Sequence, residues 1–521
     1  MPVAERHRKI ADDMTPSSTS SETTALEVEQ IGHWVAGGPV AGTSGRVAPV
    51  YDPARGVQIA EVALASPAEM DAVVTSAVEA SREWGSSSLT RRASLLFRLR
   101  ELLNASRDDL AAAVTREHGK VLDDARGEVA RGIENVEFAC GIPNLLKGSS
   151  NSEISTGVDI RTVLEPMGVV AGITPFNFPI MVPLWMMANA IACGNCFVLK
   201  PSEKDPSASL VLADIVQRAG FPDGVFNVVQ GDRQAVETLL AHPDIAAVSF
   251  VGSTPVARQI YETGTRNGKR VQALGGAKNH MVVLPDADLD AAADAAVSAA
   301  YGSAGERCMA ISVIVAVGAV ADPLIDAIAS RIPDVIVGAG NDQASMMGPL
   351  ITAEHRDRVR SYVERAADEG AKVVVDGSGT ERGSGFFVGC SLLDDVKPGM
   401  RVYDDEIFGP VLSVVRVPSL TEAVALVNGN PYGNGTALFT RDGGSARHFE
   451  REVQVGMVGI NVPIPVPVAA HSFGGWKASI FGDSSMYGPD GIRFYTRPKV
   501  VTSRWPDAEP STMELHFPTN R

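Results

Sequence analysis

The alternation of short apolar runs with helix-length segments constrains the fold of this 521-residue chain more than any other feature. Five runs in the first series are short enough to be strands: 168–173, 196–200, 225–229, 246–251 and 271–274. Segments long enough for helices separate them: 180–193, 207–219, 234–241 and 255–265. Strands connected through helices pair in parallel, because each crossover occupies one face of the sheet. The pattern therefore predicts a doubly wound, nucleotide-binding sheet.

A second series of apolar runs predicts another α/β domain, with strands at 280–284, 311–317, 371–376, 411–417, 435–440 and 456–461. The segment 30–145 is expected to be mostly helical, with helices at 67–86, 90–106 and 109–117, and to cover the first sheet. Two extended stretches without a core of their own suggest an oligomerisation arm. The predicted domains are a nucleotide-binding domain (29–145 and 166–276), a catalytic domain (277–480) and an arm (146–165 and 481–506), with tails at 1–28 and 507–521.

Charge and cysteine content restrict the partners and the compartment. A formal net charge of −16 argues against a general affinity for nucleic acid or acidic membranes. The longest apolar stretch, 180–194, contains Pro183 and Asn189 and is too short to span a bilayer, so we expect a buried helix. Five cysteines without a disulfide pattern fit a reducing, cytoplasmic location. Cys193 and Cys196 form a CxxC without a second ligand pair, so we expect packing cysteines and no metal.

The amino-terminal tail has a Ser/Thr cluster and acidic residues but no apolar core. It resembles neither a secretory signal nor a transit peptide and is expected to be disordered. Met1 and Met14 are both candidate starts.

Two segments of the first series are suited to a dinucleotide. The run Phe-Val-Gly-Ser-Thr-Pro at 250–255 ends a strand and opens a helix, where Gly252 allows close approach and Ser253 suits the cap. Free N–H groups at such a helix start favour a pyrophosphate, although a capped helix without a ligand shows the same pattern. Lys200 and Glu203 follow the end of another strand, where open α/β sheets bind ligands. A carboxylate there accepts the hydroxyls of an adenosine ribose and would repel a 2′-phosphate.

A candidate nucleophile lies in the run Gly-Ser-Ala-Gly-Glu-Arg-Cys-Met-Ala at 302–310, between a predicted helix and a predicted strand. In this glycine-flanked turn Cys308 is expected to be accessible. Arg307 and backbone dipoles are expected to lower its thiol pKa below the ordinary value of about 8.5. A single cysteine is more often a small buried residue, so the assignment depends on motifs elsewhere.

Such motifs are present at Thr-Pro-Phe-Asn-Phe-Pro (174–179), Glu-Ile-Phe-Gly-Pro-Val (406–411) and Phe-Gly-Gly-Trp-Lys (473–477). Together with 250–254 and Arg307-Cys308, they closely resemble the aldehyde dehydrogenase superfamily, in the same order and over nearly the whole chain. The resemblance implies an α/β, aldehyde-dehydrogenase-like fold with two doubly wound α/β domains plus a β oligomerisation arm. It also implies a homo-oligomer, either a dimer or a tetramer.

The resemblance further implies roles for individual residues. Cys308 would attack the aldehyde carbonyl, and the Asn177 amide with the Cys308 backbone N–H would form the oxyanion hole. The cofactor would be NAD. Its expected ligands are Lys200 and Glu203 at the adenosine ribose, Ser253 at the pyrophosphate, Glu406 at the nicotinamide ribose, and Phe176 and Phe408 near the nicotinamide.

One departure from the superfamily pattern concerns product release. Hydrolytic members carry a glutamate in a motif like Glu-Leu-Gly-Gly-Lys, whereas residues 271–280 here contain no acid. Alignment on Lys278 places Leu274 at the glutamate position, and alignment on the glycine pair places Ala273 there. An acyl-enzyme without a general base for water waits for a better nucleophile, and a thiol such as CoA is one. The Gly-Ala-Lys-Asn-His run at 276–280 is similar to the CoA-acylating methylmalonate-semialdehyde (malonate-semialdehyde) dehydrogenases.

Runs at 131–137, 430–436, 461–467 and 471–477 extend this similarity, whereas Ala470 and Ala478 replace the aromatic and basic residues common in that family. Its substrates carry a carboxylate, for which Arg131 and Arg307 are the expected counterions. An ion pair of Arg131 with Glu128 or Glu134 is the alternative.

The function implied is NAD-dependent oxidation and decarboxylation of methylmalonate or malonate semialdehyde to propionyl-CoA or acetyl-CoA, in valine or inositol catabolism. The alternatives are a general aldehyde dehydrogenase that releases the free acid and a catalytically silent scaffold on the same fold.

Overall fold

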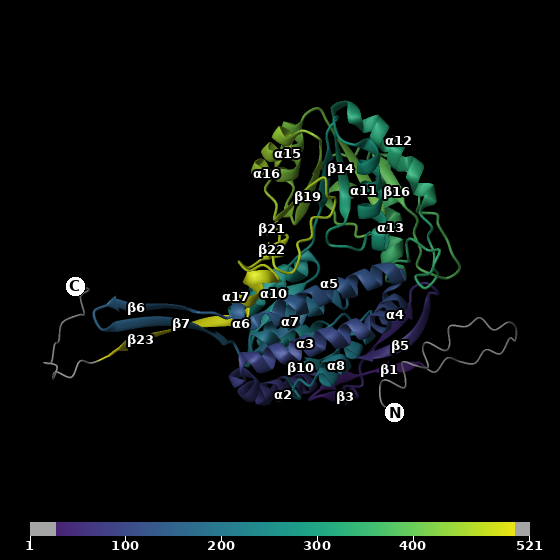
Figure 1. The fold of residues 1–521 in the computed structure, drawn as a ribbon. Helices are drawn as coiled ribbons and strands as arrows, with labels where there is room; N and C mark the ends of the chain where they lie inside the picture. The colour runs from purple at the N-terminus through teal and green to yellow at the C-terminus, as the bar shows by residue number, and fades with distance from the viewer. Residues whose placement is uncertain (1–27, 506–521) are drawn as a thin grey trace.

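The computed structural model describes residues 28–505, which form two α/β units and a three-stranded sheet that projects from the first unit (Figure 1). The tail predicted at 1–28 lies outside the described residues except for Val28, and so does the tail predicted at 507–521. No helix within 28–505 is both long and apolar enough to cross a membrane.

The first unit is built on an eight-stranded sheet. Its strand order is β22 (Ile480–Phe481), β12 (Arg270–Leu274), β11 (Ile245–Val251), β8 (Val169–Ile173), β9 (Cys196–Lys200), β10 (Phe226–Val228), β2 (His33–Val35) and β3 (Gly38–Val40). The strands from β12 to β10 pair in parallel, which confirms the prediction from the first apolar series. Chain order runs outward from β8 in both directions, so the switch point lies between β8 and β11, where open α/β sheets bind ligands.

Helices cover both faces of this sheet: α2 (Pro67–Ser86), α3 (Leu89–Ala105), α4 (Arg107–His118), α5 (Leu122–Cys140), α6 (Ile142–Leu145), α7 (Met181–Ala192), α8 (Ser207–Ala219), α9 (Arg233–Ala241) and α10 (Thr254–Arg266). Every residue of α7 is buried, which confirms the buried helix predicted there. Cys193 and Cys196 are 1% and 0% exposed, as expected for packing cysteines.

The structure adds elements that the sequence patterns did not predict. Among them are β2, β3 and a small sheet of β1 (Glu29–Ile31), β5 (Val57–Ala63) and β4 (Val47–Asp52).

The second unit contains a seven-stranded sheet in the order β15 (Lys372–Val375), β16 (Ser391–Asp394), β17 (Val411–Val417), β14 (Ile311–Val317), β13 (Asn279–Val283), β19 (Gly435–Phe439) and β20 (Met457–Ile460). All neighbouring strands are parallel except β15 and β16. Its helices are α11 (Leu289–Tyr301), α12 (Ala321–Arg331), α13 (Ala353–Ala366), α14 (Arg401–Asp404), α15 (Leu420–Gly429) and α16 (Gly443–Glu452), with short 3-10 turns at Gly302–Gly305, Gly318–Val320 and Ile332–Asp334. A separate two-stranded pair joins β18 (Tyr432–Gly433) and β21 (Trp476–Lys477).

The projecting sheet consists of β23 (Thr496–Arg504), β7 (Val158–Pro166) and β6 (Ser149–Ser155), all antiparallel (Figure 1). Of the segment 481–506 assigned to the arm, only β23 belongs to this sheet. β22 instead pairs with β12, and the stretch expected to be extended contains α17 (Gly488–Phe494). That helix forms because Ile492 and Phe494 are buried in the core of the first unit.

The carboxyl ends of the strands in the first sheet face the amino ends of the strands in the second sheet. The segments that follow β8 and β11 leave the carboxyl ends of the first sheet, and the segments that precede β13, β14 and β17 enter the amino ends of the second. Residues from both sets line one cavity. The candidate site therefore lies between the two units.

Candidate active site

A cavity of about 670 Å³ lies between the two units and contains Cys308 in its wall. Its lining residues are Pro175, Phe176, Asn177, Lys204, Val251, Gly252, Ser253, Thr254, Pro255, Gly275, Gly276, Cys308, Thr352, Glu354, His355, Arg358, Tyr362, Asp405, Glu406, Phe408 and Tyr432. Five predicted site residues that are far apart in the sequence are thus brought together with Cys308: Phe176, Asn177, Ser253, Glu406 and Phe408.

The turn that carries Cys308 has an unusual backbone. Ser303, Ala304 and Gly305 have consecutive positive φ angles of 53°, 52° and 72°. Such angles cost energy in non-glycine residues and persist where surrounding contacts hold them. At Gly305 a side chain is also excluded, because a Cβ would lie 2.3 Å from the Gly409 carbonyl oxygen. This close approach brings the cysteine turn against the segment that contains Glu406 and Phe408.

The Cys308 backbone is held, while its thiol is not activated. Asn279 and Asn434 donate side-chain hydrogen bonds to the Cys308 carbonyl oxygen at 2.9 and 3.1 Å. Burial and then the nearby Glu406 carboxylate raise the thiol pKa to about 12. Backbone N–H groups and Arg307 act in the opposite direction but do not offset this. The expected lowering of the thiol pKa is therefore wrong for this structure.

Asn177 is placed beside Cys308 by contacts at both of its ends. Its side-chain Nδ2 donates to the Glu306 backbone carbonyl oxygen at 2.9 Å. The backbone carbonyl oxygen of Asn177 accepts from Lys120 Nζ at 2.5 Å. Asn177 and Cys308 both line the large cavity and a second, smaller one. The amide nitrogen has a second N–H, so one donor stays available for a ligand in the cavity that Asn177 shares with Cys308.

Aromatic and polar groups form the remaining walls. The Phe176 and Phe408 rings meet edge to face, with centroids 5.9 Å apart. Phe408 has a φ of 58°, and His355 Nε2 donates to its carbonyl oxygen at 2.7 Å. Glu406 Oε1 accepts from the Ala277 N–H at 2.9 Å. Ser253 precedes α10 without making a side-chain cap bond, so its hydroxyl is free to contact a ligand.

Lys200 and Glu203 lie at the end of β9, as predicted, but do not line the cavity. They form an ion pair of 3.0 Å. Although burial alone would raise the pKa of Glu203, the Lys200 charge and hydrogen bonds lower it overall. Lys204 lines the cavity instead, with Nζ 4.8 Å from the centre of the Phe176 ring.

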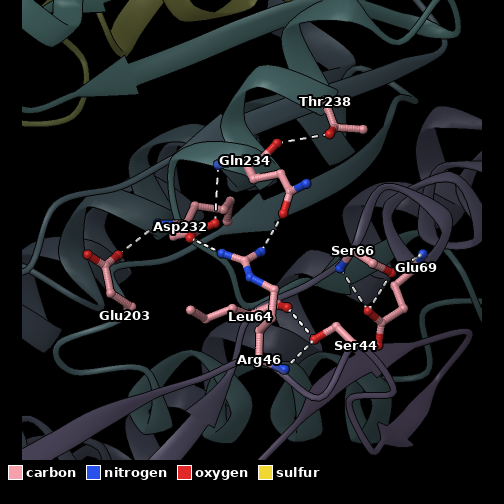
Figure 2. A network of polar contacts seen from close by, with 10 residues as sticks. Ser44, Arg46, Leu64, Ser66, Glu69, Glu203, Asp232, Gln234 and Thr238 are labelled. Atoms are coloured by element: carbon pink, nitrogen blue, oxygen red, sulfur yellow. Dashed lines mark hydrogen bonds and ion pairs between the residues drawn. The ribbon is translucent and has the colours of Figure 1, made fainter.

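A polar network fixes the start of α9 and is drawn with Glu203 in Figure 2. Arg46 binds both Asp232 and Gln234, and Asp232 Oδ1 caps α9 by accepting from the Gln234 N–H at 3.1 Å. At α2, Glu69 Oε2 accepts from the Ser66 N–H at 2.8 Å in a capping box. These contacts join segments far apart in the sequence at this edge of the sheet.

Comparison with known proteins settles the family. The model of the aldehyde dehydrogenase family matches residues 40–501. The chain belongs to the aldehyde dehydrogenase family. A malonate-semialdehyde dehydrogenase from Pseudomonas aeruginosa is 52% identical over 492 residues, which cover 94% of this chain and 99% of the relative.

Two solved structures resemble this aldehyde dehydrogenase closely. One is a methylmalonate-semialdehyde dehydrogenase from Oceanimonas doudoroffii, with a TM-score of 0.91 and 51% identity. The other is an NAD complex of a Sinorhizobium meliloti protein assigned provisionally to the same enzyme, with a TM-score of 0.92 and 51% identity. Each alignment covers 92% of this chain and 99% of the other.

The segment that lacks an acid adjoins the nucleophile. Ala273 and Leu274 end β12 and are 0% and 3% exposed. Leu274 lines the smaller cavity together with Cys308, whereas Ala273 lines neither that cavity nor the large one. Among residues 28–505, the carboxylates that line the large cavity belong to Glu354, Asp405 and Glu406.

The two predicted carboxylate ligands are engaged elsewhere in this structure. Arg131 Nη1 pairs with Glu134 Oε2 at 2.8 Å, the alternative considered for this residue, and Arg307 Nη2 contacts Asp124 Oδ1 at 2.6 Å. Neither arginine lines the large cavity. Both ion pairs are partly exposed, with side-chain exposures of 22% to 38%. Each arginine can therefore leave its present carboxylate partner and bind the carboxylate of a substrate.

Arg131 nevertheless lies near the smaller cavity. Its charge acts on the hydroxyl of Tyr487, whose pKa is raised mainly by burial. The Tyr487 ring packs against Trp185 and Phe473, with centroid distances of 5.1 and 5.8 Å. Trp185 and Phe473 line the smaller cavity beside Cys308.

Seven lining residues lie outside every segment that the sequence analysis singled out: Lys204, Thr352, Glu354, His355, Arg358, Tyr362 and Asp405. His355 and Arg358 lie one turn apart on α13, and Arg358 Nη2 donates to the Glu406 carbonyl oxygen at 2.8 Å. The only signal near them is Thr352, which caps α13. Within residues 28–505, no group of three or more His, Cys, Asp or Glu residues is arranged to hold a metal ion.

The raised thiol pKa predicts slow alkylation of the free enzyme. We expect the rate of Cys308 modification by iodoacetamide to be low at pH 7 and to rise about tenfold per pH unit up to pH 9, because only the thiolate reacts and pH stays below the pKa of about 12. Glu406→Gln should accelerate the reaction across this range, since removing a negative charge lowers the thiol pKa. Peptide mapping identifies the modified cysteine. A rate that begins to level off by pH 9 would show a thiol whose pKa is ordinary or lowered.

Proposed function

We propose that this aldehyde dehydrogenase uses NAD and CoA to oxidise and decarboxylate methylmalonate or malonate semialdehyde, producing propionyl-CoA or acetyl-CoA. The observation that supports this proposal most directly is the surroundings of Cys308. A thiol and the Asn177 amide share one cavity, while Leu274, which the alignment on Lys278 puts at the glutamate position of hydrolytic members, is apolar. The relatives' names agree with the same substrate class.

In the proposed reaction the Cys308 thiol loses its proton to water, and the Sγ thiolate attacks the aldehyde carbonyl carbon. The negative charge that develops on the carbonyl oxygen is stabilised by the second N–H of Asn177 and by the Cys308 backbone N–H. Loss of hydride from the same carbon converts the adduct to a thioester on Cys308. The oxidised acyl group carries a β-carboxylate, so its thioester carbonyl accepts the electrons released when CO₂ leaves, and the α carbon of the resulting enolate then takes up a proton from water.

The cavity fits NAD. The Ser253 hydroxyl and the first N–H groups of α10 are free to receive a pyrophosphate. Glu406 and Phe408 line the same cavity and would contact the nicotinamide ribose and ring. NAD, when bound, would accept the hydride. Lys200 and Glu203 would hold the adenosine ribose from the end of β9. The Glu203 carboxylate favours NAD over NADP because it would repel a 2′-phosphate.

Release from Cys308 then depends on a thiol. A CoA thiolate attacking the thioester carbonyl forms the new thioester and returns the Cys308 thiolate, a near-balanced exchange. Water would need a general base, and neither Ala273 nor Leu274 can accept a proton. CoA is therefore the proposed acceptor.

The proposed binding of the substrate carboxylate by Arg131 and Arg307 is tested by replacing each arginine. Arg131→Ala or Arg307→Ala should raise the KM for malonate semialdehyde far more than that for propanal. A charge-assisted hydrogen bond of about 1.5–3 kcal/mol corresponds to roughly a 10- to 150-fold loss. Steady-state kinetics with both aldehydes measure the ratio.

Arg126→Ala is the matched control for this experiment. Arg126 lies on the same helix as Arg131 and pairs with Asp108 and Asp123 at the surface. Arg126→Ala should change neither the KM for malonate semialdehyde nor the KM for propanal. Equal losses on both aldehydes in the Arg131 or Arg307 variant would assign these arginines to the fold or the thiol.

The proposal extends to assembly and location. The projecting sheet exposes Ile154, Val163 and Val500, by 50%, 36% and 62%, which supports its use as the arm of a homodimer or homotetramer. A cytoplasmic location and a place in valine or inositol catabolism complete the proposal.

A further inference from the structure

The turn that carries Asn177 is held by residues outside the cavity. Helix α7 begins after Ile180, whose side chain makes no cap bond. The N–H groups of Ile180 and Met181 instead donate to Glu128 Oε1 at 2.8 and 3.2 Å. A carboxylate at a helix start is stabilised by the free N–H groups and the helix dipole. Helix α5 thus supplies the cap that the sequence of α7 lacks.

Lys120 joins this cap to Asn177 itself. Its Nζ donates to Glu128 Oε2 at 2.8 Å and to the Asn177 carbonyl oxygen at 2.5 Å, and lies 4.4 Å from the centre of the Phe178 ring. Lys120 follows Gly119, which ends α4 with a φ of 90°, a conformation that favours glycine. The chain reversal there directs Lys120 toward α7.

The Lys120–Glu128 pair is fully enclosed, with side-chain exposures of 1% and 0%. Burying two charges costs solvation energy that their attraction often only offsets, so such a pair is weak evidence for stability. Asp205, also buried, does not compete for the lysine as an anion, because burial and the neighbouring carboxylates Glu117 and Glu128 raise its pKa well above the ordinary range. Lys120 Nζ therefore keeps its hydrogen bonds to Glu128 and to the Asn177 backbone.

We propose that Lys120 and Glu128 are positioning residues for the oxyanion hole, an inference that rests on the proposed role of Asn177. They fix the backbone at Asn177 and at the start of α7, while the Glu306 carbonyl fixes the amide. With both ends held, the remaining amide N–H is restricted in orientation within the cavities that Asn177 shares with Cys308. Donors held in place in advance stabilise a transition state without reorganisation.

The test removes the lysine contact without leaving a buried charge. In Lys120→Met/Glu128→Gln, the new glutamine still accepts from the α7 N–H groups, but the Asn177 carbonyl loses its donor. The single-turnover rate of NADH formation should fall by up to about 100-fold, as for small displacements of reacting groups, with the KM for NAD nearly unchanged. Lys120→Gln/Glu128→Gln retains an N–H donor and should recover part of the rate.

Lys269→Met is the matched control. Lys269 is another buried lysine, 6% exposed, whose Nζ holds backbone carbonyls, including that of Ile245 at 2.8 Å, at the opposite ends of β11 and β12. It should lower the thermal unfolding temperature and leave the single-turnover rate unchanged. Each variant is checked for folding by thermal unfolding and NAD binding. If the Met/Gln variant does not fold, the Gln/Gln variant is compared in its place.

A double-mutant cycle with Asn177→Ala separates the proposed oxyanion role of Asn177 from the proposed positioning role of Lys120 and Glu128. If Lys120 acts through Asn177, its loss should slow the reaction strongly in the wild-type background and little in Asn177→Ala. Equal slowing in both backgrounds would overturn the positioning role while leaving the role of Asn177 intact. A wild-type rate in Asn177→Ala would overturn the oxyanion assignment and, with it, the positioning role.

Discussion

Cys308→Ala is expected to abolish both steady-state NADH formation and the first turnover, while NAD still binds. The thioester forms on this sulfur, and the other four cysteines, Cys140, Cys193, Cys196 and Cys390, are all buried. Asn177→Ala should retain turnover at a rate lower by about 10²–10³, since it removes one of two oxyanion donors. Rapid-mixing absorbance gives the rates, and intact-protein mass spectrometry shows whether an acyl group is attached.

NAD titration is the control for the Cys308 variant. Binding should survive because the proposed pyrophosphate and ribose ligands, Ser253, Glu203 and Glu406, are unchanged. Ordinary activity in Cys308→Ala would end the proposed mechanism and return attention to the buried cysteines.

Mixing the wild-type enzyme with NAD and semialdehyde in the absence of CoA is expected to give a burst of about one NADH per competent site, followed by slow turnover. The first turnover needs only Cys308, the oxyanion hole and NAD, whereas release needs a nucleophile that residues 271–280 do not activate. CoA should raise the steady rate strongly and leave the burst amplitude unchanged, because it acts after hydride loss.

Product analysis with each semialdehyde, with and without CoA, completes this test. Fast steady turnover to the free acid without CoA would refute the acylating assignment and favour a hydrolytic aldehyde dehydrogenase. Glu406 would then be the first candidate for the base, because its carboxylate lines the cavity and its charge acts on Cys308. Loss of that hydrolysis in Glu406→Gln, with the burst retained, would identify it.

The sequence alone predicted both parallel-stranded sheets and several of the residues that meet between them. Strand periodicity is a local property, and parallel strands joined by helices leave few possible arrangements. Motifs at Asn177, Ser253, Cys308 and Glu406 follow or precede strand ends, so their convergence follows from the topology. Three or four residues carry little periodic signal, and the short strands β16 and β1 were missed, although the equally short β10 and β15 were found.

Tertiary structure alone decided what depends on contacts between distant segments. The sequence places Arg307 next to Cys308, but its guanidinium binds Asp124, and enclosure by protein with Glu406 nearby raises the thiol pKa instead of lowering it. Helix α17 forms where an extended chain was predicted, because burial of Ile492 and Phe494 outweighs weak local preference. Likewise, no pattern around Lys120 indicates that it reaches Asn177, since hydrogen bonds and desolvation are set by which groups the folded chain brings within about 3 Å.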